Sequence, residues 1–216
     1  MGRSDHGAGP AAVIVAVEGP TAAGKSTWCR QQRLPVVDEY APTGEEPDGA
    51  DRDQQAAYWV QVNSQRWQQA IDLEKQNPLV LCDSDPLKLH YSWCLARIGA
   101  APWARFHHEL RHVRTALEAG RLGFADMVLV SIPPLHVLRG RRATDTTRQR
   151  RSFDLHAKLS EPLREWYSAV ERAEPGRLVW SWPETGVPIS LGERHQRCDP
   201  ALLDRVIEHL PARDAL

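Results

Sequence analysis

The residues most suited to chemistry form a glycine-rich motif near the N-terminus. Residues 19–26 read GPTAAGKS and match the pattern G-x-x-x-x-G-K-[ST] at every fixed position. The aliphatic run at residues 12–17 predicts a strand before the motif, and a helix is expected to begin within it. In that context successive backbone N–H groups and the helix N-terminus converge on phosphate oxygens. The motif therefore predicts a site for a nucleoside triphosphate.

Two side chains of this motif can hold phosphate and metal. Lys25 is expected to bridge the outer phosphates, and the hydroxyl of Ser26 is expected to ligate Mg²⁺. We therefore expect ATP and Mg²⁺ to bind here. The residues predicted to contact the nucleotide are Gly19, Thr21, Ala22, Ala23, Gly24, Lys25, Ser26 and Thr27.

An acidic segment follows the third predicted strand. The apolar run at residues 78–82 is followed by Asp83, and Asp85 comes two positions later. A carboxylate at the carboxyl end of a buried strand can reach Mg²⁺ directly or through water, so Asp83 is the predicted second metal ligand. The segment DSDP also fits a strand-ending turn in which an Asp side chain caps the next helix. Both roles can hold at once.

A second acidic pair, Asp38 and Glu39, follows the short strand predicted at residues 34–37. A carboxylate placed there could accept the proton of an incoming acceptor hydroxyl. We expect Glu39 to be the catalytic base, and Asp85 and Asp38 are the alternatives. An ordinary solvated loop would carry the same residue types, because acidic side chains are mostly exposed.

Basic residues concentrate in residues 139–151, which read RGRRATDTTRQRR. This segment follows the fourth predicted strand and could fold over a nucleotide as a lid, excluding water and stabilising charge on the transferring phosphoryl group. Arg142 and Arg148 flank the turn-forming residues 144–145 and are the arginines expected to act in catalysis. A solvated basic loop or a nucleic-acid patch is the alternative.

The composition limits the classes of partner. With 27 basic and 28 acidic residues the net charge is -1, which gives no reason to expect nucleic acid or a charged membrane surface as a partner. The longest apolar run is well short of the ~20 residues that span a membrane. We expect a single cytoplasmic domain over residues 1–216, with a flexible tail at residues 1–11, that acts on a small molecule. The sequence leaves a homodimer open.

Strand and helix patterns alternate along the chain. Short aliphatic runs predict buried strands at residues 12–17, 34–37, 78–82, 126–132 and 177–182. Longer amphipathic stretches predict helices that include residues 53–76, 103–120 and 153–173. This alternation is typical of an α/β protein in which helices cover both faces of a parallel sheet. Ligands of such sheets bind beyond the carboxyl ends of the strands.

A different motif lies within the helix predicted at residues 103–120. His108, Glu109 and His112 fit the pattern H-E-x-x-H, which on a helix binds zinc through both imidazoles. Arg111 places a positive charge between the two histidines, and that charge opposes metal binding. We therefore expect a polar helix face beside the acceptor cleft rather than a zinc site.

The order of these motifs resembles the P-loop nucleoside and nucleotide kinase superfamily, near its deoxynucleoside kinase, thymidylate kinase and ribosylnicotinamide kinase branches. The resemblance covers most of residues 12–182 and implies a three-layer P-loop NTPase fold with a five-stranded parallel sheet and an Arg-rich lid. It also implies that the γ-phosphoryl group of ATP is transferred, with Mg²⁺, to a small acceptor.

Two segments are similar to functional sites of that superfamily. VLCDSDP is similar to its acidic site after the third strand, with Asp83 and Asp85 at the two acids. Ser84 departs from the pattern, because thymidylate kinases have an arginine there that helps to hold the acceptor. DEYAP is similar to the Glu-Pro site of deoxynucleoside kinases, with Glu39 in the position of their general base, although Tyr40 and Ala41 intervene before the proline.

The sequence therefore predicts an ATP-dependent kinase that transfers a phosphoryl group to a hydroxyl or phosphate of a small molecule. A nucleoside or nucleoside-like compound is the expected acceptor. One alternative is a phosphotransferase for an antibiotic or another natural product, because the acceptor pocket is built from the least constrained segments. The other is a P-loop ATPase or switch module that has no small acceptor.

Overall fold

The protein is built on one parallel β-sheet. The computed structural model describes residues 12–47, 51–145, 152–188 and 196–212, and within these ranges five strands pair in the order β2-β3-β1-β4-β5. Every neighbouring pair is parallel. The strands are β1 (Val13–Glu18), β2 (Val36–Val37), β3 (Leu79–Asp83), β4 (Met127–Val130) and β5 (Leu178–Val179). The predicted α/β fold class and all five predicted strands are confirmed.

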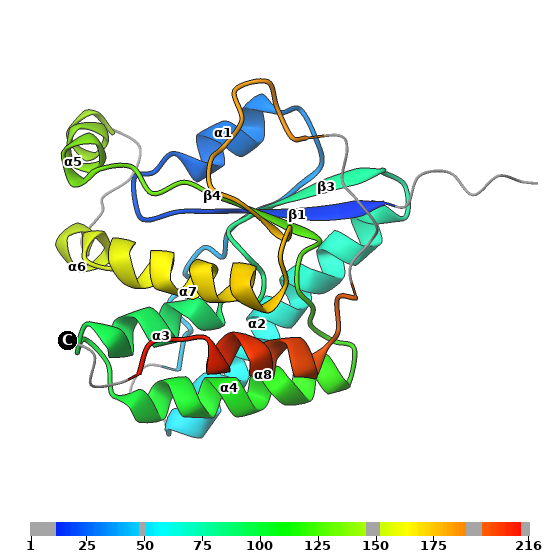
Figure 1. Ribbon diagram of the computed structural model, residues 1–216, viewed down its shortest axis with the longest axis vertical. Helices are drawn as coiled ribbons and strands as arrows, with labels where there is room; N and C mark the ends of the chain where they lie inside the picture. Colours follow the sequence, from blue (N-terminus) through cyan, green and yellow to red (C-terminus); the bar gives the residue numbers. More distant parts are fainter. Residues whose placement is uncertain (1–11, 48–50, 146–151, 189–195, 213–216) are drawn as a thin grey trace, which may run out of the picture.

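Helices cover both faces of the sheet (Figure 1). They are α1 (Lys25–Gln31), α2 (Arg52–Glu74), α3 (Leu89–Arg97), α4 (Trp103–Glu118), α5 (Leu135–Thr144), α6 (Phe153–Ala157), α7 (Ser160–Ala173) and α8 (Pro200–Glu208). Helix α1 lies on one face, and α2, α3, α4, α7 and α8 pack on the other. The single helix predicted at residues 153–173 is instead two helices, and Pro162 lies in the first turn of the second, where proline is tolerated.

The alternation of side chains along β1 explains the two layers of helices. Ile14 and Ala16 belong to the larger apolar cluster, which includes side chains of α2, α3, α4, α7 and α8. Val15 and Val17 point to the opposite face and pack with Cys29 of α1. These four side chains of β1 are fully buried, as expected for a central strand of a covered parallel sheet.

An ion-pair network joins distant segments at the amino ends of the strands. Arg197 donates from Nε to Asp126 Oδ1 at 2.7 Å and from Nη1 to Glu74 Oε2 at 2.8 Å. Asp126 Oδ2 also accepts the backbone N–H of Ile14 at 2.8 Å. Arg197 and Asp126 are almost fully buried, so their charges depend on each other for stabilisation.

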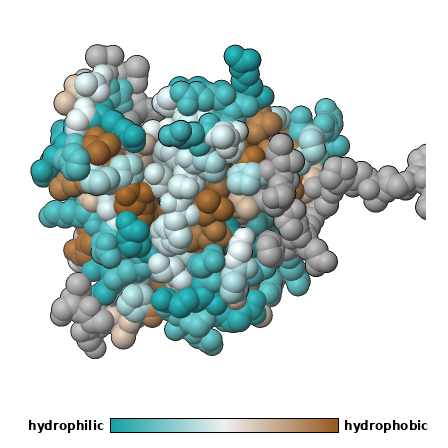
Figure 2. Space-filling view, turned by 45° about the horizontal axis from the view of Figure 1, so that its top comes forward, coloured by the Kyte–Doolittle hydropathy of each residue, from teal (hydrophilic) through white to brown (hydrophobic). Residues whose placement is uncertain are grey.

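The face of the molecule seen in Figure 2 is mostly hydrophilic, with separate hydrophobic patches rather than one broad apolar surface. No helix within the described ranges is long and apolar enough to cross a membrane. The lid predicted at residues 139–151 begins within α5, and its remainder from residue 146 onward lies outside the described residues, as does the predicted tail at residues 1–11.

Candidate active site

The loop between β1 and α1 turns tightly at the carboxyl end of the sheet. Gly24 has φ of 99°, a conformation that glycine adopts without steric cost, and it precedes the first residue of α1. A Cβ atom at Gly19 would lie 2.4 Å from the carbonyl oxygen of Ser131, so only glycine fits there. Lys25 folds back over the loop, and its Nζ donates to the Gly19 carbonyl oxygen at 3.0 Å. The loop thus presents an ammonium group beside closely packed backbone.

A cavity of about 1030 Å³ opens beside this loop, and all eight residues predicted to contact the nucleotide line it. The cavity beside the loop is also lined by Trp28, Trp182 and Arg141, which contact the loop or one another. We call this part of the cavity, with the loop, the donor end, because the predicted phosphate donor would bind there. Another set of lining residues comes from the segment after β2 and from α2, α3, α4, α6 and α7, which together define an acceptor end. This set includes Tyr40, Trp59, Asn63, Tyr91, Arg105, Glu109, His156 and Leu163.

Ser26 and Asp83 form a pair that fits a magnesium ion. The Ser26 hydroxyl hydrogen-bonds to the Asp83 carboxylate, which is 3% exposed. Asp83 Oδ1 is buried and has no hydrogen-bond partner within the described residues. Burial raises the pKa of Asp83, although the hydroxyl of Ser26 and the charge of Lys25 oppose the rise. A hard cation would relieve this uncompensated carboxylate, and hydroxyl and carboxylate oxygens are the ligands that Mg²⁺ takes.

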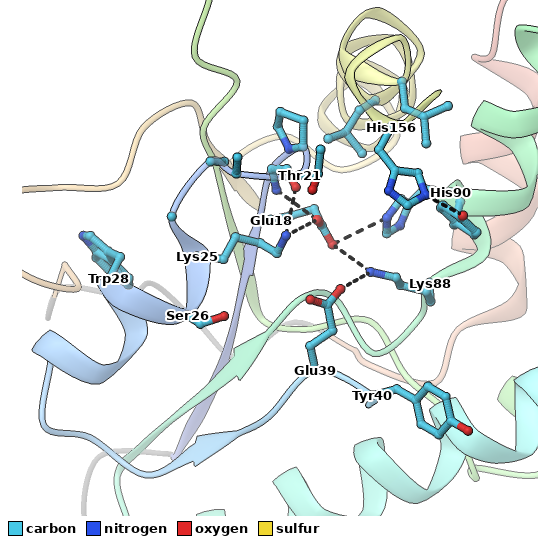
Figure 3. A pocket seen from close by; sticks show the side chains of 18 of the residues that line it. Glu18, Thr21, Lys25, Ser26, Trp28, Glu39, Tyr40, Lys88, His90 and His156 are labelled. Carbon is cyan, nitrogen blue, oxygen red and sulfur yellow. Dashed lines mark hydrogen bonds and ion pairs between the residues drawn. The ribbon is translucent and has the colours of Figure 1, made fainter. Parts of the chain in front are cut away.

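Glu39 lies in the cavity, where it forms an ion pair with Lys88 (Figure 3). Lys88 Nζ is 3.2 Å from Glu39 Oε1. Burial raises the pKa of Glu39, but the charges of Lys88 and Lys25 outweigh it and bring the value to about 2. Burial likewise opposes the charge of Lys88, and Glu18 and Glu39 more than compensate, so its pKa is raised. Both groups are therefore charged at neutral pH.

Glu18, at the end of β1, is a buried carboxylate between the two ends of the cavity. Its Oε1 accepts the backbone N–H of Gly19 at 2.9 Å, and its Oε2 accepts the hydroxyl of Ser84 at 2.9 Å. Lys25 Nζ and Lys88 Nζ each lie 3.9 Å from one of its oxygens (Figure 3). Burial raises the pKa of Glu18, but the cations around it dominate, so the pKa lies well below its usual value. No motif marks Glu18 in the sequence, although a charged side chain that ends an apolar strand beside the glycine-rich loop is a usable signal.

The other two candidate bases do not line the cavity. Asp85 is 5% exposed; its Oδ1 accepts the backbone N–H of Leu87 at 3.0 Å, and its Oδ2 accepts the hydroxyl of Tyr167 at 3.1 Å. The strand-ending turn that DSDP predicts is therefore present at Asp85, but no Asp side chain caps α3, whose N-cap residue is Lys88. Asp38 has an exposed side chain, and its backbone carbonyl oxygen accepts from Arg66. Of the three candidates, Glu39 alone is among the residues that line the cavity.

A buried arginine fixes the strand ends that carry these acids. Arg66 of α2 is 6% exposed and donates from Nη2 to the carbonyl oxygens of Asp83 and Ser84, at 2.8 and 2.9 Å. Its Nε donates to the carbonyl oxygen of Asp38 at 3.0 Å. One guanidinium therefore joins the segments that follow β2 and β3. No sequence pattern distinguishes Arg66 from the other polar residues of α2.

The arginines of the predicted lid have different surroundings. Arg141 hydrogen-bonds to the carbonyl oxygen of Ala23 and lines the cavity. Arg142 does not line it; its guanidinium lies 4.7 Å from the centre of the Phe153 ring and 3.9 Å from Asp154 Oδ1. Arg148 lies outside the described residues. The choice of Arg142 as a catalytic residue is therefore not supported by its position, and Arg141 takes its place at the loop.

The residues of the H-E-x-x-H motif contact a neighbouring helix. His108 Nδ1 and His112 Nε2 each lie 3.0 Å from the same oxygen of Asp53 at the start of α2, and Arg111 lies 3.5 Å from it. No group of three metal-binding side chains occurs within the described residues. Glu109, the middle residue of the motif, lines the acceptor end of the cavity instead. The expected polar helix face is present.

Comparison with known proteins gives structural matches only. No protein-family model matches the chain, and no curated protein matches its sequence. A deoxyadenosine kinase from M. mycoides with bound dATP superposes with a TM-score of 0.53 and 14% identity, covering 77% of this chain and 89% of that one. The structure of that kinase with products dCMP and a flexible dCDP bound gives 0.52 and 13%, over 90% and 95%. The chain has a P-loop nucleoside kinase-like fold.

A second protein shares this architecture. NadR protein in complex with NR superposes with a TM-score of 0.52 and 19% identity, covering 93% of this chain and 51% of that chain. At these identities the likeness concerns the fold, and the chemistry of this chain has to be argued from its own residues.

Proposed function

We propose that this protein is a kinase that transfers the γ-phosphoryl group of ATP to a hydroxyl of a small nucleoside-like molecule. The observation that carries this proposal is one cavity that is lined both by the phosphate-binding loop and by the ionised carboxylate of Glu39. Phosphoryl transfer requires positioning and charge neutralisation more than covalent chemistry. The residues along the cavity can supply both.

The donor end has the groups that phosphate requires. Lys25 leaves its contact with the Gly19 carbonyl oxygen and binds the outer phosphates. Arg141 adds a second cation beside the loop and stabilises charge on the transferring group. Ser26 and Asp83 would hold Mg²⁺, which supplies charge neutralisation to the phosphates when bound.

Glu39 orients the acceptor. With a pKa near 2 the carboxylate is ionised at neutral pH and accepts a hydrogen bond from the attacking hydroxyl. A weakly basic carboxylate suffices, because in a loose transition state the hydroxyl proton leaves late and positioning is the larger contribution. The cation that contacts Glu39, Lys88, is already paired with carboxylates. This end of the cavity is therefore better suited to a neutral hydroxyl than to an acceptor phosphate.

The acceptor end favours a planar, polar molecule. Arg105 and Glu109 lie one turn apart on α4, with Arg105 Nε 2.9 Å from Glu109 Oε1. Within the described residues, the Nη groups of Arg105 and Oε2 of Glu109 have no further hydrogen-bond partner. The Nη groups are hydrogen-bond donors and the carboxylate oxygen beside them is a hydrogen-bond acceptor. This arrangement complements an amide-like edge such as that of a nucleobase. Trp59 and Tyr91 line the same region and offer ring surface for stacking.

A panel of acceptors tests the proposal. ATP consumption would be measured with nucleosides, nucleoside monophosphates and aminoglycoside-like alcohols, and products identified by mass. Without an acceptor we expect slow ATP hydrolysis. With a nucleoside, ATP consumption should rise at least about 10-fold, because the phosphoryl group is transferred to the nucleoside and yields its monophosphate. The Lys25→Ala protein, which lacks the phosphate-binding ammonium, is the control for contaminating kinases. Equal hydrolysis with every acceptor would indicate an ATPase module, and transfer to aminoglycosides alone would overturn the nucleoside-like acceptor.

A further inference from the structure

Lys88 has an unusual backbone for a lysine. It precedes α3 and has φ of 48° and ψ of 0°, in the left-handed region that L-residues other than glycine, asparagine and aspartate seldom adopt. Such a conformation persists where surrounding contacts determine it, and it often occurs at functional sites. Here it accompanies a side chain that reaches into the cavity, toward Glu39 and Glu18 (Figure 3).

The ammonium group of Lys88 meets three oxygen-bearing side chains. It lies 3.2 Å from Glu39 Oε1 and 3.9 Å from Glu18 Oε2, and it also donates to the hydroxyl of Ser84. Glu18 and Ser84 are almost fully buried and hydrogen-bond to each other. The Lys88 ammonium is therefore held from the P-loop side of the cavity by groups that cannot move easily.

Glu39 has far less support than Lys88. It follows β2, a strand of only two residues, and its side chain is 33% exposed. Within the described residues, Lys88 makes the only hydrogen bond or ion pair with its carboxylate. A carboxylate with one anchor would otherwise sample several rotamers, which lowers the fraction of molecules in a reactive geometry.

We propose that Lys88 is a positioning residue for phosphoryl transfer: held by Glu18, it fixes the Glu39 carboxylate at the point where the acceptor hydroxyl enters. The chain of contacts runs from the backbone N–H of Gly19 through Glu18 and Lys88 to Glu39. This connection sets the acceptor base relative to the phosphate-binding loop. The inference rests on the proposed kinase function.

Neighbouring charged groups do not substitute for Lys88. Arg66 is occupied by backbone carbonyl oxygens, and Lys25 lies at the loop beside Glu18. Burial lowers the pKa of His90 to about 4, and it lowers the pKa of His156, so neither favours the charged form at neutral pH. The carboxylates of Asp83 and Glu18 carry the opposite charge to Lys88, so they raise the pKa of a nearby carboxylate such as Glu39 instead of lowering it. Lys88 is thus the cation whose loss should alter Glu39 most.

Three variants separate positioning from folding. Lys88→Met removes the ammonium, Lys88→Arg keeps a cation, and Lys88→Gly removes the side chain while relieving the left-handed backbone conformation. Both Lys88→Met and Lys88→Gly leave buried Glu18 with one cation fewer, and Lys88→Gly should be the more stable of the two because it relieves the backbone conformation. Lys75→Met is the control, since exposed Asp72 is the only ion-pair partner of Lys75 within the described ranges. Thermal unfolding of each variant would be compared first.

Two readouts then test the contact. The first is the pKa of Glu39, measured by ¹³C NMR of its carboxyl carbon without substrate. The wild-type pKa is depressed to about 2, so the carboxylate is lost only in strong acid. Without Lys88 we expect the pKa to rise by at least about one unit, and Lys88→Arg to restore part of the shift. An unchanged pKa in both Lys88→Met and Lys88→Gly would overturn the inference.

The second readout is the pH dependence of kcat and KM with the best acceptor. We expect Lys88→Gly and Lys88→Met to lower kcat at least about 10-fold, to leave the KM for ATP within about 2-fold, and to move the acidic limb to higher pH. With Glu39→Gln already present, removal of Lys88 should have little further effect. If the double variant lost kcat by the product of the two single-variant losses, the positioning role of Lys88 would be overturned. A wild-type protein that phosphorylates no acceptor would overturn the proposed function and with it this role, whereas the NMR readout would still report on the contact.

Discussion

Arg141 hydrogen-bonds through its guanidinium to the backbone carbonyl oxygen of Ala23, which joins α5 directly to the phosphate-binding loop. Its neighbour Arg142 lies over the ring of Phe153 and near Asp154, on the first turn of α6. Two adjacent arginines on one helix therefore face different parts of the molecule. Their comparison tests whether α5 contributes to chemistry.

We predict that Arg141→Ala lowers kcat at least about 10-fold, because a cation beside the transferring phosphoryl group is lost. Arg142→Ala should change kcat less than about 2-fold, since its guanidinium contacts α6 rather than the cavity. Steady-state kinetics of both proteins at saturating ATP would measure this difference. Equal losses in the two variants would show that the whole helix, rather than Arg141, is required.

The pairing of Ser26 with Asp83 predicts a specific metal dependence. Asp83→Asn keeps the size of the side chain but removes the charge that attracts Mg²⁺, so the half-saturating Mg²⁺ concentration should rise about 10-fold or more. Isothermal titration of Mg²⁺ into the protein with a non-hydrolysable ATP analogue would measure it directly. Glu39→Gln is the matched control, because it alters a carboxylate that lines the cavity and is not a predicted metal ligand. If the half-saturating Mg²⁺ concentration rose equally in both variants, the loss of any negative charge near the site, rather than the loss of a metal ligand, would explain the effect.

The sequence was sufficient for the parts of the site that a local motif determines. The loop from Gly19 to Thr27 has glycine at position 24, where φ is 99°, and at position 19, where a side chain would collide with Ser131. Both glycines are fixed positions of the motif, although Ala22 also has a positive φ of 61°. Asp83 and Glu39 were also predictable, because the carboxyl ends of parallel strands meet at one edge. The fold class followed from the alternation of aliphatic runs and amphipathic stretches.

The remainder of the site depends on contacts between distant segments. Glu18 and Lys88 are 70 positions apart, and no spacing rule connects them. Whether Arg141 or Arg142 faces the loop depends on the rotation of α5, which a single helical turn cannot reveal. Asp85 and Asp83 differ by two positions, yet the turn after β3 sends one into a buried hydrogen-bond network and the other toward Ser26.

The pair of Arg105 and Glu109, which lines the cavity, predicts acceptor selectivity. Arg105→Met should lower kcat/KM for a nucleoside about 10- to 100-fold, because a charge-assisted hydrogen bond is lost and Glu109 loses its partner. The KM for ATP should stay within about 2-fold. Arg111→Met, on the solvent-exposed side of the same helix, is the control. A nucleoside analogue lacking the hydrogen-bonding edge should be insensitive to Arg105→Met; an equal loss with that analogue would contradict the assignment.

The buried network at the amino ends of the strands predicts a change in stability without a change in nucleotide binding. Arg197→Met fills a similar volume but leaves Asp126 charged and unpaired in the interior, so we expect the free energy of unfolding to fall by about 3–5 kcal/mol. Arg205→Met breaks the 3.4 Å pair with Asp199, in which the arginine is half exposed, and should cost no more than about 1 kcal/mol. Urea unfolding would compare the two, with nucleotide affinity measured on the folded proteins. Arg197 lies at the amino ends of the strands and the phosphate-binding loop at their carboxyl ends, so nucleotide affinity should be unchanged in the folded Arg197→Met protein. If the binding free energy fell by as much as the free energy of unfolding, the sheet would not hold the loop independently of this network.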